Sequence, residues 1–194
     1  MHSMIKGGVP ARVTGTKLRV EAAWKGTSGG DKSLMGKVKA AKGIDLDMIT
    51  VGLLSRAPKG ICWFDDTDPF NNGSVIAGKD ASGRRLPFGK QDPLSRESHE
   101  VDLSSVPSYV DTLIFSVSAY KPGVSFRDVS SVTCNIQVDG QDWEPLRVTV
   151  NAHENTCFML KASRSGNEWE ISVVDELATA NTQDQLMTKA AQYA

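Results

Sequence analysis

Period-two alternation is the feature that most constrains this chain. Between Lys17 and Val174, short runs place apolar residues at every second position, which is the pattern of a strand with one buried face. Polar turns with Asp, Asn and Gly separate the runs, and no strand–helix–strand rhythm occurs, so doubly wound and TIM-barrel folds are poor fits. The pattern predicts a mostly β chain folded as a two-sheet antiparallel sandwich. The predicted strands are Lys17–Trp24, Asp111–Tyr120, Ser131–Val138, Pro145–Val150, Thr156–Ala162 and Glu168–Val174.

Helix is expected in only two places. Ser125–Val129 fits a single turn between strands, and Asn181–Tyr193 fits a short C-terminal helix. In the second segment, apolar residues recur at helical spacing, which predicts a face that packs on the sandwich; a helix that binds a partner is the alternative. The residues of this stripe are Leu186, Met187, Ala190, Ala191 and Tyr193.

Length and composition set the class of protein. The 194 residues suit one domain, expected to span 1–194 with its core at about 5–175, and the Gly- and Lys-rich segment Gly26–Gly43 reads as a long mobile loop. With 22 Lys and Arg against 23 Asp and Glu, the net charge of -1 argues against nucleic-acid binding. No apolar run approaches the roughly 20 residues that cross a bilayer, and the N-terminus lacks the apolar core of a secretory signal. We therefore expect a cytoplasmic protein without direct membrane insertion.

The cysteines and histidines do not indicate catalysis. Cys62, Cys134 and Cys157 have no metal-ligand spacing and stand among apolar neighbours, which predicts buried structural thiols. The three histidines are scattered, so neither a zinc site nor a Ser-His-Asp triad is indicated. No nucleophile can be paired with a base, and we expect a protein that is not an enzyme.

Oxygen-bearing side chains gather between Gly43 and Leu103. Alternation puts Asp45 and Asp47 on the face of a strand that is apolar a few residues later, so desolvation should place both at the end of the sheet, beside a loop with a cation or basic side chain. A mixture of carboxylates and amides on loops suits Ca²⁺, which takes six to eight oxygens. Ordinary turn residues are the alternative explanation, because Asp, Asn and Gly favour turns for local reasons. The other donors are Asp65, Asp66, Asp68, Asn71, Asn72, Asp80, Asp92 and Glu97.

A series of short motifs runs through the chain in a characteristic order. The most specific is Asp45-Leu46-Asp47, followed by Phe64-Asp65-Asp66 and, near the end, by Asn167-Glu168-Trp169. Over about Ile5 to Val174, this series resembles the TerD family, the tellurium-resistance and stress-response group of calcium-binding β-sandwich proteins. The remaining motifs are Met4–Gly8, Trp24, Gly73–Val75, Gly78–Asp80, Val101–Leu103 and Ser125–Val129.

The resemblance implies a TerD-like two-sheet sandwich and a calcium site in its loops. It further implies a non-enzymatic bacterial protein that works with other stress-response proteins. Three family positions that are expected to be acidic carry Lys25, Lys79 and Arg96 here, so the implied calcium site is degenerate, or salt bridges replace it. The implied ligands are Asp45, Asp47, Asp65, Asp66, Asp80 and Glu97.

The alternative function is a calcium-independent protein-interaction module. In that case the same loops bind another protein through the basic and aromatic residues Arg84, Arg85, Phe88 and Lys90.

Overall fold

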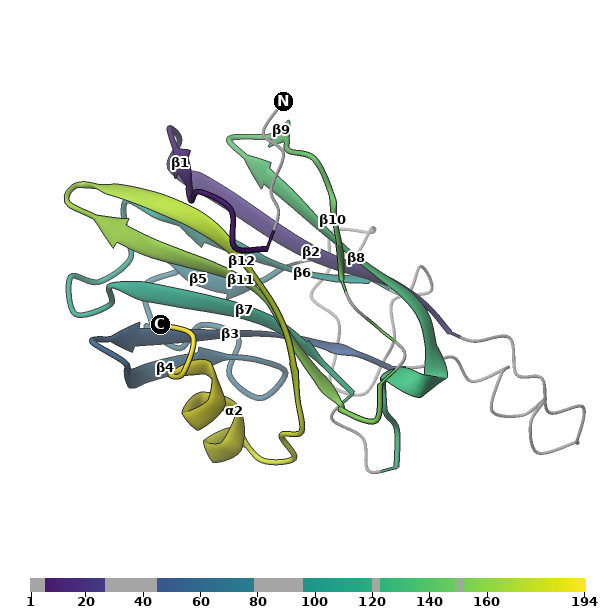
Figure 1. Ribbon diagram of the computed structural model, residues 1–194. Helices are drawn as coiled ribbons and strands as arrows, with labels where there is room; N and C mark the ends of the chain where they lie inside the picture. The colour runs from purple at the N-terminus through teal and green to yellow at the C-terminus, as the bar shows by residue number, and fades with distance from the viewer. Residues whose placement is uncertain (1–5, 27–44, 79–95, 120–122, 149, 151) are drawn as a thin grey trace, which may run out of the picture.

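Two antiparallel sheets form the molecule (Figure 1). The computed structural model describes residues 6–26, 45–78, 96–119, 123–148, 150 and 152–194. Sheet A contains, in spatial order, β1 (Ala11–Val13), β12 (Glu168–Ala178), β11 (Thr156–Ser165), β7 (Thr112–Ser118), β3 (Asp47–Leu54) and β4 (Ala57–Cys62). Sheet B contains β10 (Leu146–Val148), β8 (Val129–Val138), β2 (Lys17–Gly26), β6 (Arg96–Asp102) and β5 (Val75–Ala77), with β9 (Gln141–Asp142) paired to β8.

The main core lies between the sheets and is built from the alternating residues of their strands. All six runs that alternation predicts are strands, with ends that differ by a few residues, and the three cysteines are buried as expected. The predicted two-sheet sandwich is therefore confirmed. The side chains predicted to share this core do so: Trp24, Phe115, Cys134, Trp169 and Ile171.

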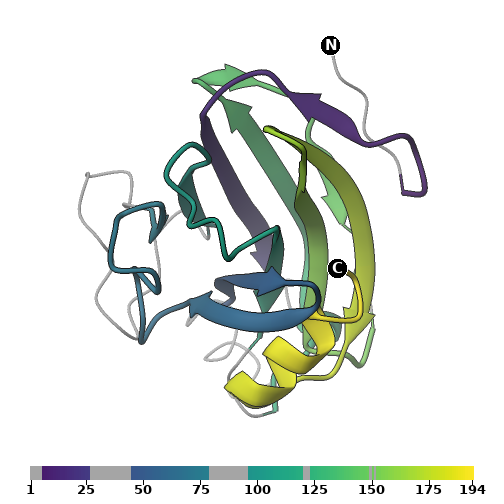
Figure 2. The same ribbon diagram turned by 90° about the vertical axis from the view of Figure 1, so that its left-hand side faces the viewer.

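A second core covers the outer face of sheet A. Along β3, Met48 points into the main core, whereas Ile49, Val51 and Leu53 belong to the second one. Figure 2 shows α2 (Gln183–Ala190) lying against β3 and β4 on this face. The helix therefore packs on the sandwich, and its whole predicted stripe is buried or packed there: Leu186, Met187, Ala190, Ala191 and Tyr193.

Both predicted helical segments are shorter than their sequence patterns. Thr182 is the N-cap of α2, and its side chain accepts a hydrogen bond from the backbone of Gln185, so the helix begins two residues later than expected. The turn in Ser125–Val129 is a 3₁₀ helix, η1 (Phe126–Asp128), closed by a capping box between Ser125 and Asp128.

β4 is an edge strand that alternation does not reveal. It contains Pro58 and Gly60, residues that weaken a strand pattern and are tolerated at a sheet edge. The ring of Phe70 lies over Gly60 and over Gly52 of β3; a Cβ at Gly52 would stand 2.5 Å from the tip of that ring. The glycines thus make room for an aromatic side chain from the following loop.

Two further expectations concern a long loop and membrane-spanning segments. Of the expected long loop Gly26–Gly43, only Gly26 is described, as the last residue of β2; the rest lies outside the described residues. None of the helices in the described part of the chain has the length and apolar character needed to span a bilayer.

Truncation of Phe115 tests the main core. Its side chain is 1% exposed, so Phe115→Ala should lower the free energy of unfolding by about 3–5 kcal/mol through lost burial and the cavity left behind. Val9→Ala is the control, because Val9 is 96% exposed and should cost less than about 0.5 kcal/mol. Chemical denaturation measures both; a loss below about 1 kcal/mol for Phe115→Ala would contradict the packing described above.

Candidate functional site

The described candidate carboxylates lie at one end of the sandwich. β3 begins there with Asp47, and its antiparallel neighbour β4 ends there, so Asp65 and Asp66 follow in the adjoining turn. In sheet B, β5 ends and β6 begins at the same end, and Glu97 is the second residue of β6. We call this the acidic end. The topology thus brings together candidates that stand up to 50 residues apart in the sequence.

Asp45 and Asp47 form the electrostatic centre of the acidic end. Asp47 is half-buried, and burial, together with the negative charge of Asp45, raises the pKa of Asp47 to about 7. Within the described part of the chain, no Lys, Arg or His forms an ion pair with Asp47. A carboxyl group with such a raised pKa is stabilised in its charged form by a nearby cation, and the hard oxygen atoms of Asp45 and Asp47 are the donor type that calcium prefers. In donor type, the residues present fit the calcium ion that the family resemblance implies.

Glu97 reaches the same place from the other sheet. Its Oε2 accepts a hydrogen bond from the backbone N–H of Met48, at a donor–acceptor distance of 2.8 Å. Met48 directly follows Asp47, so the Glu97 carboxylate lies beside the start of β3.

Asp65 and Asp66 are exposed turn residues. The Trp63 N–H donates to the Asp66 carbonyl at 2.9 Å, and the Asp66 side chain accepts from the backbone N–H of Asp68 at 3.2 Å. Asp68 in turn accepts from the N–H of Gly73. These contacts match the alternative explanation in which the aspartates serve the turn itself.

The six predicted ligands do not assemble into one group among the described residues. No three side chains of His, Cys, Asp or Glu in the described ranges lie close enough together to hold a metal ion. Asp80 lies outside those ranges, two residues after Gly78, which contacts β6 through a hydrogen bond from its N–H to the Ser98 carbonyl. The described centre therefore consists of Asp45 and Asp47, with Glu97 alongside.

Two of the three basic residues that were expected to offset these charges, Lys25 and Arg96, lie in the described part of the chain. Lys25 is exposed and, among the described residues, forms no ion pair. Lys79 lies outside the description, and Arg96 opens β6 as a half-buried residue next to Glu97.

A buried polar cluster behind the acidic end was missed by the sequence analysis. The Nδ1 of His99 lies 2.7 Å from Thr50 Oγ1, and its Nε2 lies 3.9 Å from Cys62 Sγ. Burial lowers the pKa of His99 to about 3, so the imidazole is neutral at physiological pH. The sequence feature that could have revealed this cluster is the inward position of His99 in the alternation of β6. That position indicates that His99 is buried, but it cannot show which residues His99 contacts across the sandwich.

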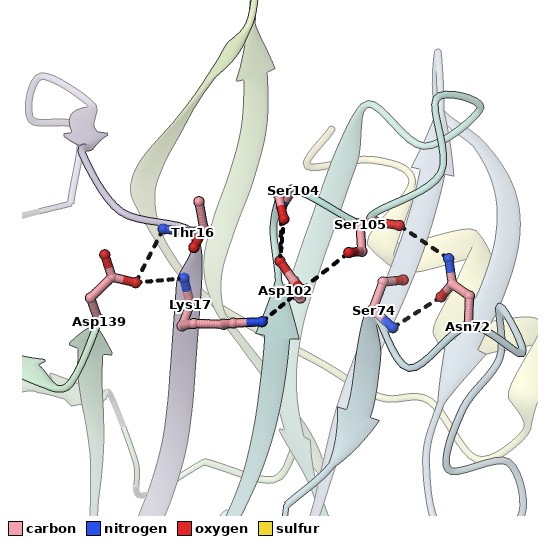
Figure 3. A network of polar contacts seen from close by, with 8 residues as sticks. All are labelled: Thr16, Lys17, Asn72, Ser74, Asp102, Ser104, Ser105 and Asp139. Atoms are coloured by element: carbon pink, nitrogen blue, oxygen red, sulfur yellow. Dashed lines mark hydrogen bonds and ion pairs between the residues drawn. The ribbon is translucent and has the colours of Figure 1, made fainter.

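The opposite end of sheet B shows how this fold satisfies a carboxylate internally (Figure 3). Asp102 accepts hydrogen bonds from Lys17 Nζ at 2.6 Å, Ser104 Oγ at 2.6 Å and Ser105 Oγ at 3.1 Å. These donors, Lys17 first, hold the pKa of Asp102 well below its usual range. Asp139 accepts from the backbone N–H of Lys17 at 2.8 Å. A carboxylate with internal donors thus has a lowered pKa, whereas that of Asp47 is raised.

Next to this network is a cleft of about 280 Å³ on the outer face of sheet B. Its charged lining residues are Lys17, Arg19, Glu100 and Asp102, two of each sign. This balance favours neither an anionic nor a cationic ligand.

Substituting asparagine for aspartate at each end tests the contrast. Without calcium and between about pH 4 and 7, Asp47 should be protonated in the folded protein and ionised in the unfolded chain. The free energy of unfolding should therefore fall as pH rises through that window. Asp47→Asn should therefore raise the free energy of unfolding at pH 8 by roughly 1–3 kcal/mol, and the gain should vanish below about pH 4.

Asp102→Asn is the matched control with the opposite sign. In the wild-type protein, the lowered pKa of Asp102 stabilises the fold above about pH 4, and this contribution is lost as pH falls. The variant should be less stable than wild type at pH 8. If Asp47→Asn were also destabilising at pH 8, a basic side chain would compensate Asp47, as the salt-bridge interpretation requires.

The chain was compared with known families, curated proteins and solved structures. No family model matches it, and no curated protein matches it. Its fold is similar to that of SAV2460, a protein of unknown function, with a TM-score of 0.65 and 14% identity over 91% of this chain and 97% of that one. It is equally similar to SCO6318 from Streptomyces coelicolor A3(2), a homologue of the telluride resistance protein TerD, with a TM-score of 0.64 and 14% identity over 91% of this chain and 98% of that one.

At this identity the comparison shows the fold. The two neighbours are matched over nearly their whole lengths, in agreement with the order of motifs that first suggested the resemblance. The chain has the TerD-like β-sandwich fold.

Proposed function

We propose that this chain is a non-enzymatic TerD-like protein that binds calcium weakly at the acidic end. The observation that carries the proposal is the raised pKa of Asp47, beside Asp45 and without an ion pair in the described part of the chain. A divalent cation there would remove both the repulsion between the carboxylates and the cost of their burial.

The number of ligands limits the affinity. Calcium takes six to eight oxygens, whereas the described centre offers two carboxylates and Glu97, which is already hydrogen-bonded to a backbone N–H. The remaining oxygens would come from water, from backbone carbonyls and from Asp80, a predicted ligand outside the described residues. We therefore expect binding in the millimolar range rather than the micromolar range of calcium sensors.

The fold neighbour SCO6318, a homologue of the telluride resistance protein TerD, supports a proposed biological setting. We propose a role in a bacterial stress-response or tellurium-resistance system, in the cytoplasm and in association with other stress-response proteins. Neither nucleic acid nor a membrane is a partner in this proposal.

A calcium-independent interaction module is the second candidate. The local hydrogen bonds of Asp66 and Asp68 favour it, because these side chains are already occupied in shaping their own loop. In that case Arg84, Arg85, Phe88 and Lys90, which lie outside the described residues, would contact the partner.

Thermal unfolding with and without calcium separates the two candidates. A ligand that binds only the folded state stabilises it by RT ln(1 + [L]/Kd), so calcium at ten times its Kd should raise the Tm by about 3–6 °C for a chain of this size. Asp47→Asn should abolish this shift. Asp142→Asn, at the exposed strand β9 beyond the opposite end, should retain it.

Magnesium at the same concentration controls for ionic strength. A Tm that calcium does not change in the wild-type protein would contradict the calcium proposal and favour the interaction module.

A further inference from the structure

β6 contacts β3 across the sandwich through two of its side chains. Glu97 Oε2 accepts from the N–H of Met48, and His99 Nδ1 lies 2.7 Å from Thr50 Oγ1. Glu97 and His99 are two residues apart, and so are Met48 and Thr50. The two contacts therefore form successive rungs that join sheet B to the first half of β3.

The Glu97 rung replaces a missing strand partner. The pairing of β3 with β4 extends only to Thr50, which lies opposite Cys62, so β4 does not reach Met48. Met48 is buried, and a buried backbone N–H needs an acceptor. The Glu97 carboxylate supplies that acceptor where the sheet no longer can.

The position of this hydrogen bond links it to the acidic end. The N–H of Met48 belongs to the peptide group that joins Met48 to Asp47. An acceptor that fixes this peptide also fixes the orientation of the backbone that carries Asp47 and, two residues before it, Asp45. The neighbouring rung at His99 is wholly buried and holds the strand one step further in.

We propose that Glu97 is a positioning residue that fixes the start of β3, and not a calcium ligand. Only the part of this inference that concerns calcium binding rests on the proposed function. The inference also changes the role of Glu97, which the family resemblance implied to be a ligand. A positioning role needs only a hydrogen-bond acceptor at this place, whereas a ligand role depends strongly on the negative charge, because a neutral amide oxygen is a weaker calcium ligand than a carboxylate.

Glu97→Gln and Glu97→Ala separate these requirements. The Gln amide oxygen can still accept from the N–H of Met48, but it carries no charge; Ala can do neither. In the metal-free protein, the amide hydrogen of Met48 should exchange at a similar rate in wild type and Glu97→Gln, and at least about tenfold faster in Glu97→Ala. Unchanged exchange in Glu97→Ala would overturn the proposal.

Calcium titration calorimetry on the same proteins gives the second readout. Glu97→Gln should retain the affinity of the wild type within about threefold, and Glu97→Ala should lose at least about tenfold. If Glu97→Gln loses as much affinity as Glu97→Ala while its Met48 amide stays protected, Glu97 is a ligand and the proposal fails. Should Glu97→Ala not fold, the comparison of Glu97→Gln with the wild type decides alone.

The two proposals can fail separately. A wild-type protein that binds no calcium would contradict the proposed function, whereas the exchange rates of Met48 would still decide whether Glu97 fixes the start of β3.

Discussion

Sheet A is covered on both faces, by sheet B on one side and by α2 with the C-terminal residues on the other. This double burial accounts for the long apolar run of β3, in which Met48 faces one core and Ile49, Val51 and Leu53 face the other. It also determines what happens where the run begins. Asp47 stands on the helix-covered face at the very start of the strand, so it is partly removed from water together with its neighbour Asp45.

The two ends of the sandwich treat their carboxylates in opposite ways. At one end, Asp102 is surrounded by donors from its own chain, and a lysine from the adjacent strand completes the set. At the acidic end, burial and, after it, the negative charge of Asp45 raise the pKa of Asp47. The first arrangement stabilises a loop without any ligand, whereas the second, in the function proposed above, would gain stability from a bound cation. We regard this asymmetry as the physical basis for a cation-linked role.

Much of this could be predicted from the sequence, because alternation is a local property. It identified β2, β7, β8, β10, β11 and β12, and it placed Asp45 and Asp47 on the face of Ile49 at a strand end. What it could not predict depends on register between distant strands. β4 carries Pro58 and Gly60 and shows no alternation, and the contacts of Glu97 with Met48 and of His99 with Thr50 join residues 49 positions apart in different sheets. The role of Asp80 lies outside the described residues and stays a prediction.

The central proposal is that calcium compensates the charge of Asp47, which forms no ion pair with the described residues. Carbon-detected NMR of the Asp47 carboxyl group, titrated over pH without and with calcium, measures this directly. The account predicts a midpoint near pH 7 in the metal-free protein, because burial and Asp45 disfavour the charged form, and a marked fall of that midpoint when calcium is added. A midpoint near pH 4 that calcium does not move would contradict it.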